Sequence, residues 1–210
     1  MALDRRVSRE RRLWVVLLLD LLLIAGLLIV GLRAHSLGVL AAGAGYLADA
    51  AAIGVSLFVI WLANKPPSRR RPGGYPNATT VVALVNGGWL LVLSVLVIVT
   101  AIQRLMAGAP SVEGLPVLIV SAVAAVVMLV GALILGGGDV DDDDDDLNVK
   151  AVLLDTAADA VASGGVALSG AIILFTHGLY WLDPAVALII AVVVGYHALK
   201  LVKKVVAALR

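Results

Sequence analysis

The chain has 210 residues, of which 61% are hydrophobic and only 15% are charged, whereas ordinary globular proteins carry about 25% charged residues. Thirteen of the 16 Lys and Arg residues fall into three short clusters and seven of the 15 acids form one run, so long stretches between them are almost uncharged. This pattern excludes a soluble globular protein and a nucleic-acid-binding patch. The chain has no Cys, which excludes disulfides, thiolate metal sites and thiol catalysis. We predict an all-α integral membrane protein.

Six apolar stretches are near or above the ~20 residues that a helix needs to cross a bilayer, the sixth only if its lysines reach the interface. They run near residues 13–32, 37–63, 79–103, 115–135, 149–175 and 184–206. They lack the alternation of apolar and polar residues that a barrel wall requires. We expect one transmembrane domain over residues 1–210, a six-helix bundle with no soluble domain after the sixth helix.

The orientation of the bundle follows from its Lys and Arg residues, which are enriched on the cytoplasmic side of membrane proteins. With the N-terminus inside, 14 of them lie in inner segments, and only Arg33 and Arg104 lie in outer ones. We therefore predict that both termini are cytoplasmic. As a separate expectation, we place the protein in the cell membrane, the plasma or inner membrane.

Two connecting segments have distinctive sequences. The loop at residues 136–147 is largely a run of Asp, which either concentrates cations weakly or is a solvated connector. The pair Asp183-Pro184 is typical of an N-cap followed by Pro at the first helical position, and it predicts the start of the sixth helix.

Four carboxylates lie inside the predicted spans: Asp20, Asp49, Asp155 and Asp159. A charge near the bilayer centre costs ~2.5–3.5 kcal/mol by insertion scales, and such residues usually face a partner or an ion path. The spans contain no Lys or Arg at comparable depth, so a proton or a metal cation is the expected compensating charge. Asp155 and Asp159 share one helix face, with roughly 5–6 Å between their Cβ atoms. At 1.5 Å per residue, Asp49 and Asp159 reach the same level near the midplane.

The sequence resembles the cation diffusion facilitator family, whose members exchange divalent metal ions for protons. The segments that carry the resemblance cover nearly the whole chain: Ser36–Ala41 followed by Asp49, Gly74-Tyr75 through Ala83–Asn86, Leu147–Lys150 leading into Asp155 and Asp159, and Asp183-Pro184. The resemblance implies the family's transmembrane domain only, with Asp49, Asp155 and Asp159 as metal ligands, and a homodimer. The family has His or Asp four residues before Asp49, where this chain has Gly45. A water molecule, Tyr46 or Asn86 would have to take the place of that ligand.

The metal and the role of Asp20 stay open at this point. Three carboxylates without His or Cys suit Mn²⁺, whereas the family resemblance favours Zn²⁺, with Co²⁺ or Cd²⁺ as further substrates. Carboxylates must be deprotonated to bind metal, so we expect metal ions and protons to compete. Asp20 matches no family ligand and either relays protons or forms a hydrogen bond between helices.

We therefore expect a proton-coupled antiporter that exports divalent metal cations, with no tightly bound cofactor and no enzymatic activity. Its partners would be metal ions, protons, the lipid bilayer and a second copy of the chain. The alternative is a transport-inactive membrane metal-binding or regulatory protein of the same fold, which the absence of a side chain at Gly45 favours modestly. An intramembrane aspartyl protease fits less well, because two of the carboxylates lie on one helix face.

Overall fold

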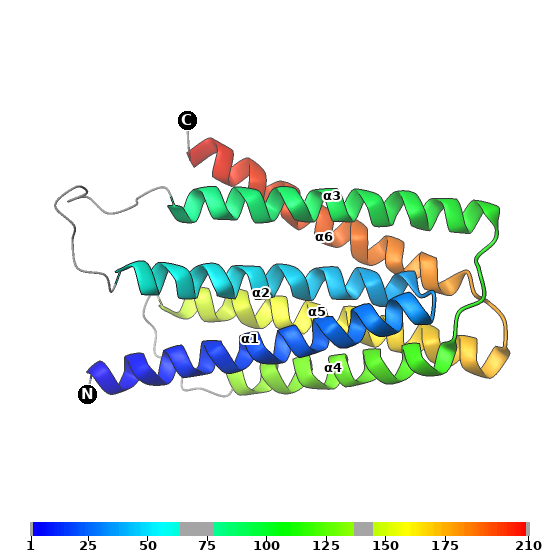
Figure 1. Ribbon diagram of the computed structural model, residues 1–210, viewed down its shortest axis with the longest axis horizontal. Coiled ribbons are helices and arrows are strands. Elements are labelled where there is room, and N and C mark those ends of the chain that lie inside the picture. Colours follow the sequence, from blue (N-terminus) through cyan, green and yellow to red (C-terminus); the bar gives the residue numbers. More distant parts are fainter. Residues whose placement is uncertain (1, 64–77, 137–144, 209–210) are drawn as a thin grey trace.

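The structure is all-helical in the part of the chain that it describes. This computed structural model describes the backbone of residues 2–63, 78–136 and 145–208, and the side chains of residues 17–47, 50–51, 54, 84–130 and 157–207. No strand occurs within these ranges. The helices lie side by side along one long axis (Figure 1). They are α1 (Ala2–Arg33), α2 (Leu37–Ala63), α3 (Ala78–Ala107), α4 (Gly114–Gly136), α5 (Asp145–Thr176) and α6 (Leu182–Ala208).

Each of the six predicted apolar stretches lies within one helix, which confirms the all-α fold class. The helices extend past the predicted spans: α1 begins at Ala2, and α5 begins at Asp145, inside the predicted acidic loop. The rest of that loop, residues 137–144, and the basic loop at residues 64–77 lie outside the described residues. An α-helix satisfies its backbone hydrogen bonds internally, as an apolar segment must in lipid.

Helix α2 is the central element of the bundle. It contacts α1, α3, α5 and α6, while α4 packs mainly against α5 and α3 mainly against α6. Figure 1 shows α2 between the α3–α6 pair and the α1–α4 pair, with α5 beside it. The buried core follows from this arrangement, since it includes Leu27 of α1, Val39 and Tyr46 of α2, and Val166 of α5. Any side chain that α2 turns inward therefore meets several helices.

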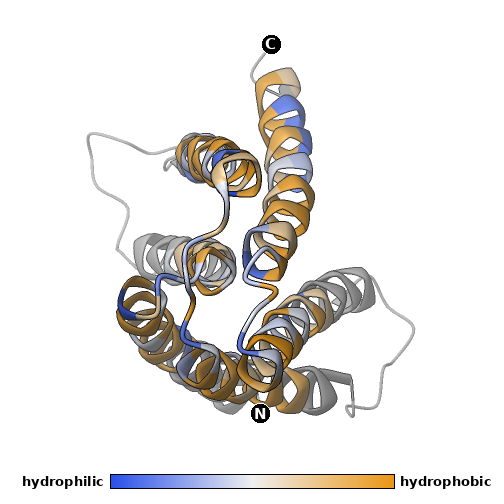
Figure 2. Ribbon diagram, turned by 90° about the vertical axis from the view of Figure 1, so that its right-hand side faces the viewer, coloured by the Kyte–Doolittle hydropathy of each residue, from blue (hydrophilic) through white to orange (hydrophobic). Residues whose placement is uncertain are grey.

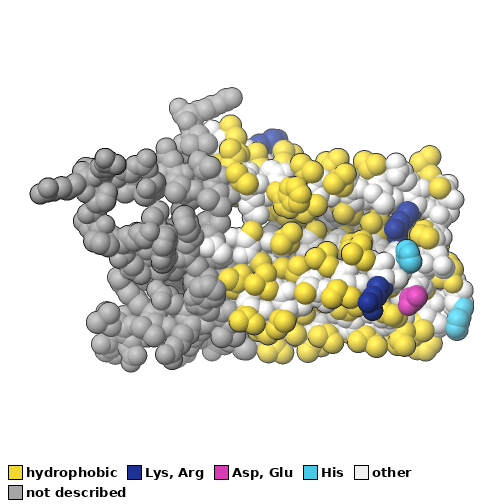
Figure 3. Space-filling model, in the orientation of Figure 1, with side chains coloured by type: hydrophobic (Ala, Val, Ile, Leu, Met, Phe, Trp, Pro, Cys, Tyr) yellow, Lys and Arg dark blue, Asp and Glu magenta, His cyan; other side chains and the backbone are white. Residues whose placement is uncertain are grey.

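The outward faces of the bundle are apolar. Fully described segments of α3, α5 and α6 are long and apolar enough to cross a membrane: Leu84–Ala107, Ala157–Thr176 and Leu182–Ala207. Hydrophobic colour covers most of the described helices in Figure 2. In Figure 3 the described charged side chains of the visible face gather mainly near the end of the bundle where α1 connects to α2, α3 to α4 and α5 to α6, which we call the short-loop end. A surface of this kind is suited to lipid, because soluble proteins do not expose apolar patches of this extent.

The two ends of the helical chain lie at the same end of the bundle. The start of α1 and the end of α6 point one way in Figure 1, and the α1–α2, α3–α4 and α5–α6 connections lie at the opposite end. This arrangement agrees with termini on one side of a membrane. That this side is the cytoplasm stays a prediction.

A buried carboxylate fastens α6 to α2 at the short-loop end. Asp183 is fully buried, and it accepts hydrogen bonds from the backbone N of Leu37 (2.6 Å), the backbone N of Gly38 (3.1 Å) and the hydroxyl of Ser36. The prediction that the sixth helix starts at Asp183-Pro184 is confirmed, since α6 begins at Leu182. The expectation that Asp183 caps its own helix is wrong, because its carboxylate caps α2. The first backbone N–H groups of a helix lack partners within that helix, and a nearby anion from another segment can satisfy them.

Candidate metal centre

The register between α2 and α5 determines which of the predicted ligands lie at one level. A Cβ built at Gly38 of α2 would lie 3.4 Å from Val166 of α5, and one built at Gly45 would lie 3.7 Å from Oδ1 of Asp159. Seven residues separate the two positions on each helix, so the antiparallel helices stay in step. One further turn leads from Gly45 to Asp49 and from Asp159 to Asp155. The backbones of Asp49 and Asp155 therefore come to the same level, so the expectation that Asp49 lies level with Asp159 is wrong by one helical turn.

Asp159 is the predicted ligand whose side chain the structure describes, and it faces α2. The side chain is partly buried, and its Oδ1 lies opposite the space that a side chain at Gly45 would enter. The side chains of Asp49 and Asp155 lie outside the described residues. Among the described side chains, to which these two acids do not belong, no group of three or more His, Cys, Asp or Glu residues could hold a metal ion.

A hydrogen bond between α2 and α5 lies next to Asp159, toward the short-loop end. The hydroxyl of Tyr46 is 2.7 Å from Oγ of Ser163, and both side chains are buried. Ser163 is four residues after Asp159, so the two lie on one face of α5. Sequence reasoning missed Ser163, although its spacing from Asp159 was a usable signal. Tyr46 was predicted as an accessory polar group, and the structure brings it to the face of α5 that carries Asp159.

Asp20 is also turned into the bundle. Its side chain is only 3% exposed, and it lies close enough to Asp159 for the two carboxylates to interact electrostatically. Asn86 on α3, the other predicted accessory residue, is partly buried and forms no hydrogen bond with any residue that the structure describes. The structure thus brings Asp20 toward Asp159 and provides no contact that joins Asn86 to it.

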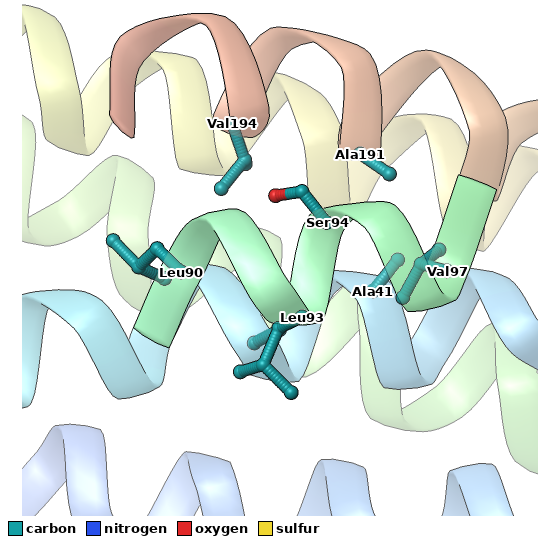
Figure 4. Close-up of a pocket in the computed structure, with 8 residues that line it drawn as sticks. Ala41, Leu90, Leu93, Ser94, Val97, Ala191 and Val194 are labelled. Carbon is teal, nitrogen blue, oxygen red and sulfur yellow. The ribbon is translucent and has the colours of Figure 1, made fainter. Parts of the chain in front are cut away.

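A small cavity among the described helices lies apart from these acids. It is lined by side chains of α2, α3 and α6, among which Ser94 is the only polar one in an otherwise aliphatic lining (Figure 4). A cation would find no carboxylate in this lining, so the cavity does not extend the candidate metal centre.

The apolar outward faces and the inward-facing acids together define an integral membrane protein whose largely apolar interior contains a few carboxylates. The chain belongs to the cation efflux family, because residues 13–210 match the model of the cation efflux transmembrane domain. The resemblance found in the sequence is thereby confirmed. The family is one of transporters rather than enzymes.

Several curated relatives match the chain along most of its length. A cadmium, cobalt and zinc/H(+)-K(+) antiporter of Bacillus velezensis is 32% identical over 88% of this chain and 60% of its own length. The zinc transporter ZitB of Yersinia pseudotuberculosis is 28% identical over 94% of this chain and 62% of its own. The human proton-coupled zinc antiporter SLC30A2 is 26% identical over 98% of this chain and 57% of its own. The chain thus spans about three fifths of the length of these relatives.

Proposed function

We propose that this chain exchanges divalent metal cations for protons across a membrane, through a carboxylate site formed by Asp49, Asp155 and Asp159. The register between α2 and α5 is the observation that supports this most directly. It brings the backbone of Asp49 level with that of Asp155, one turn from the carboxylate of Asp159. The three acids would then lie within one helical turn of one another, on two helices that are in contact.

The exchange follows from the chemistry of the ligands. Each carboxylate must lose its proton before it binds a metal ion, so metal binding releases protons and protonation expels the metal. When a site of this kind is exposed to each side of the membrane in turn, a proton gradient drives metal in the opposite direction. If the protein resides in the cell membrane, with both termini in the cytoplasm, protons that enter the cell drive export of the metal from the cytoplasm.

Zn²⁺ is the first candidate substrate, because the relatives named above include zinc transporters, and the Bacillus antiporter adds Cd²⁺ and Co²⁺. Mn²⁺ stays a candidate because a site made only of carboxylates suits a hard cation. We further propose that the six helices all span the membrane and that the protein works as a homodimer.

The proposed function is tested by metal flux into proteoliposomes that contain the 210-residue chain. Zn²⁺, Cd²⁺, Co²⁺ and Mn²⁺ are each supplied under an imposed pH gradient, and uptake is measured with an internal metal indicator. We expect uptake of at least one metal, abolished by Asp159→Ala and retained in Ser121→Ala, a substitution in the buried part of α4. Uptake that Asp159→Ala leaves unchanged would contradict the proposed site.

One observation favours a second candidate, a membrane metal-binding or regulatory protein that does not transport. Gly45 provides no side chain opposite Asp159, at the position where the family resemblance leads us to expect a ligand. Such a protein would bind Zn²⁺ in detergent and lose that binding in Asp159→Ala, yet it would show no flux of any metal in the proteoliposomes.

A further inference from the structure

Asp20 is a buried carboxylate without a hydrogen-bond partner among the described residues. It is 3% exposed, while its neighbours on both sides along α1, Leu19 and Leu21, are 43% and 52% exposed. No described residue donates a hydrogen bond to it. Burying an ionised carboxylate without a partner is strongly unfavourable, so such a group requires a proton or a cation beside it.

The register between α1 and α2 gives the level of Asp20 in the bundle. A Cβ built at Gly43 of α2 would lie 3.4 Å from Cβ of Leu27 on α1. Asp20 precedes Leu27 by seven residues, and the same step on the antiparallel α2 leads from Gly43 to Ala50, adjacent to Asp49. Both steps cover about 10 Å at 1.5 Å per residue. Asp20 is therefore level with the backbone of Asp49.

Asp20 and Asp159 approach the same stretch of α2 from two different helices. Gly43 faces α1, and Gly45 faces Asp159 of α5. Because neither glycine has a side chain, α1 and α5 can both approach α2 closely here. The two carboxylates are close enough to interact electrostatically. Two like charges brought together in an apolar bundle repel, unless a cation or a proton compensates them.

We propose that Asp20 supplies from α1 the fourth carboxylate of the metal site, in place of the side chain that Gly45 lacks on α2. This inference rests on the proposed function, since it adds a ligand to the site of Asp49, Asp155 and Asp159. The resulting set consists only of oxygen donors, contributed by α1, α2 and α5. Oxygen-only sets suit hard cations such as Mn²⁺ better than sets with nitrogen donors do.

The test begins with Asp20→Asn, which keeps the size of the side chain and removes its charge. Zn²⁺ binding to the purified chain in detergent is measured by calorimetry, and Co²⁺ is used as a probe because its visible absorption reports its ligands. Loss of an outer-shell partner of a metal ligand already costs ~10–100-fold in affinity. We therefore expect the Kd for Zn²⁺ to rise at least about tenfold and the Co²⁺ spectrum to change. Ser121→Ala, at another buried polar side chain, should change neither.

A rescue experiment separates a ligand from a residue that only supports the fold. A Cβ at Gly45 would lie 3.7 Å from Asp159 Oδ1, which is an ordinary contact, so the backbone there leaves room for a Cβ that points toward Asp159. Gly45→Asp added to Asp20→Asn should restore most of the lost Zn²⁺ affinity. No restoration, together with an unchanged Co²⁺ spectrum in Asp20→Asn, would mean that Asp20 only supports the fold.

Asp159→Ala distinguishes failure of this inference from failure of the proposed function. If Asp159→Ala abolishes Zn²⁺ binding while Asp20→Asn leaves the Kd unchanged, the role of Asp20 is overturned and the proposed site stands. If Asp159→Ala also leaves the Kd unchanged, the proposed site itself is wrong, and the role of Asp20 falls with it.

Discussion

Asp183 shows how one buried charge can hold two helices together. Its carboxylate accepts hydrogen bonds from two backbone N–H groups and one hydroxyl at the start of α2. Arg104 provides a favourable charge nearby, and its guanidinium donates a 2.7 Å hydrogen bond to the carbonyl oxygen of His35, just before α2. The carboxylate is thus hydrogen-bonded and lies within the electrostatic influence of a cation, which offsets the cost of burying its charge.

We predict that Asp183→Ala destabilises the fold by about 2–4 kcal/mol, because it removes a helix cap and leaves buried donors without an acceptor. Asp183→Asn should cost less, since it retains one oxygen acceptor. Unfolding in a mixed-detergent titration measures both, with the exposed Ser111→Ala as the control. Equal stability of Asp183→Ala and the unmodified chain would show that the contact contributes little.

At the residue scale, the sequence indicated that Asp20 and Asp159 face other helices, but it did not indicate most of the residues that they meet. The cost of charge in a membrane identified Asp20 and Asp159 without any structure. The Asp-Pro pattern, by contrast, assigned Asp183 to its own helix, because the backbone groups that it caps lie about 145 residues away in the chain. The contact between Tyr46 and Ser163 likewise joins residues 117 positions apart. Pairs at such separations depend on helix rotation and register, which local sequence does not specify.

At the scale of helices, close approach through glycine sets how α4 and α5 pack. A Cβ built at Gly170 would lie 2.8 Å from the backbone N of Leu118 and 3.1 Å from the carbonyl oxygen of Gly114. One at Gly114 would lie 2.7 Å from the carbonyl oxygen of Gly170. Small residues at helix interfaces allow backbones to come this close in membrane proteins. Because α5 carries Asp159, this contact also fixes where α5 stands in the bundle.

We predict that Gly170→Ala destabilises the protein by about 1–3 kcal/mol, because the added methyl group meets backbone atoms that cannot move independently. Gly164→Ala on the same helix is the matched control, since a Cβ there has no atom within 4 Å. That control should be neutral or stabilising by up to about 1 kcal/mol, from its better helix propensity. Thermal unfolding in detergent compares the two, and equal losses would contradict the close packing of α4 and α5.

The positions of the helices were predictable from the sequence because long apolar runs are a strong signal. Which face of each helix points into the bundle was not predictable, because a helix that is apolar all round gives little indication of which side is buried. In α1 the polar side chain of Asp20 supplied that information, and in α2 the glycines did so only once their neighbours were known. The lengths of two helices were also underestimated, because α1 extends back through charged sequence to Ala2 and α5 extends back to Asp145.

At the scale of the whole molecule, the fold separates a lipid-facing surface from an interior that carries acids. Large apolar side chains such as Leu22, Val85 and Leu168 are more than 60% exposed, while Asp20 is buried. Helix α2 contacts four of the other helices. Movement of α2 relative to α1 and α5 would therefore change the surroundings of the carboxylates at once, which is what alternating access to one site requires.

The central claim is that metal and protons exchange at one carboxylate site, and simultaneous measurement of both fluxes tests it most directly. Proteoliposomes containing the chain, a metal indicator and a pH indicator are given external Zn²⁺ without an imposed pH gradient. The account predicts that Zn²⁺ enters while protons leave, and that Asp159→Ala abolishes both fluxes together. Zn²⁺ entry that is not accompanied by proton exit would contradict the claim. Zn²⁺ entry and proton exit that both persist in Asp159→Ala would contradict it as well.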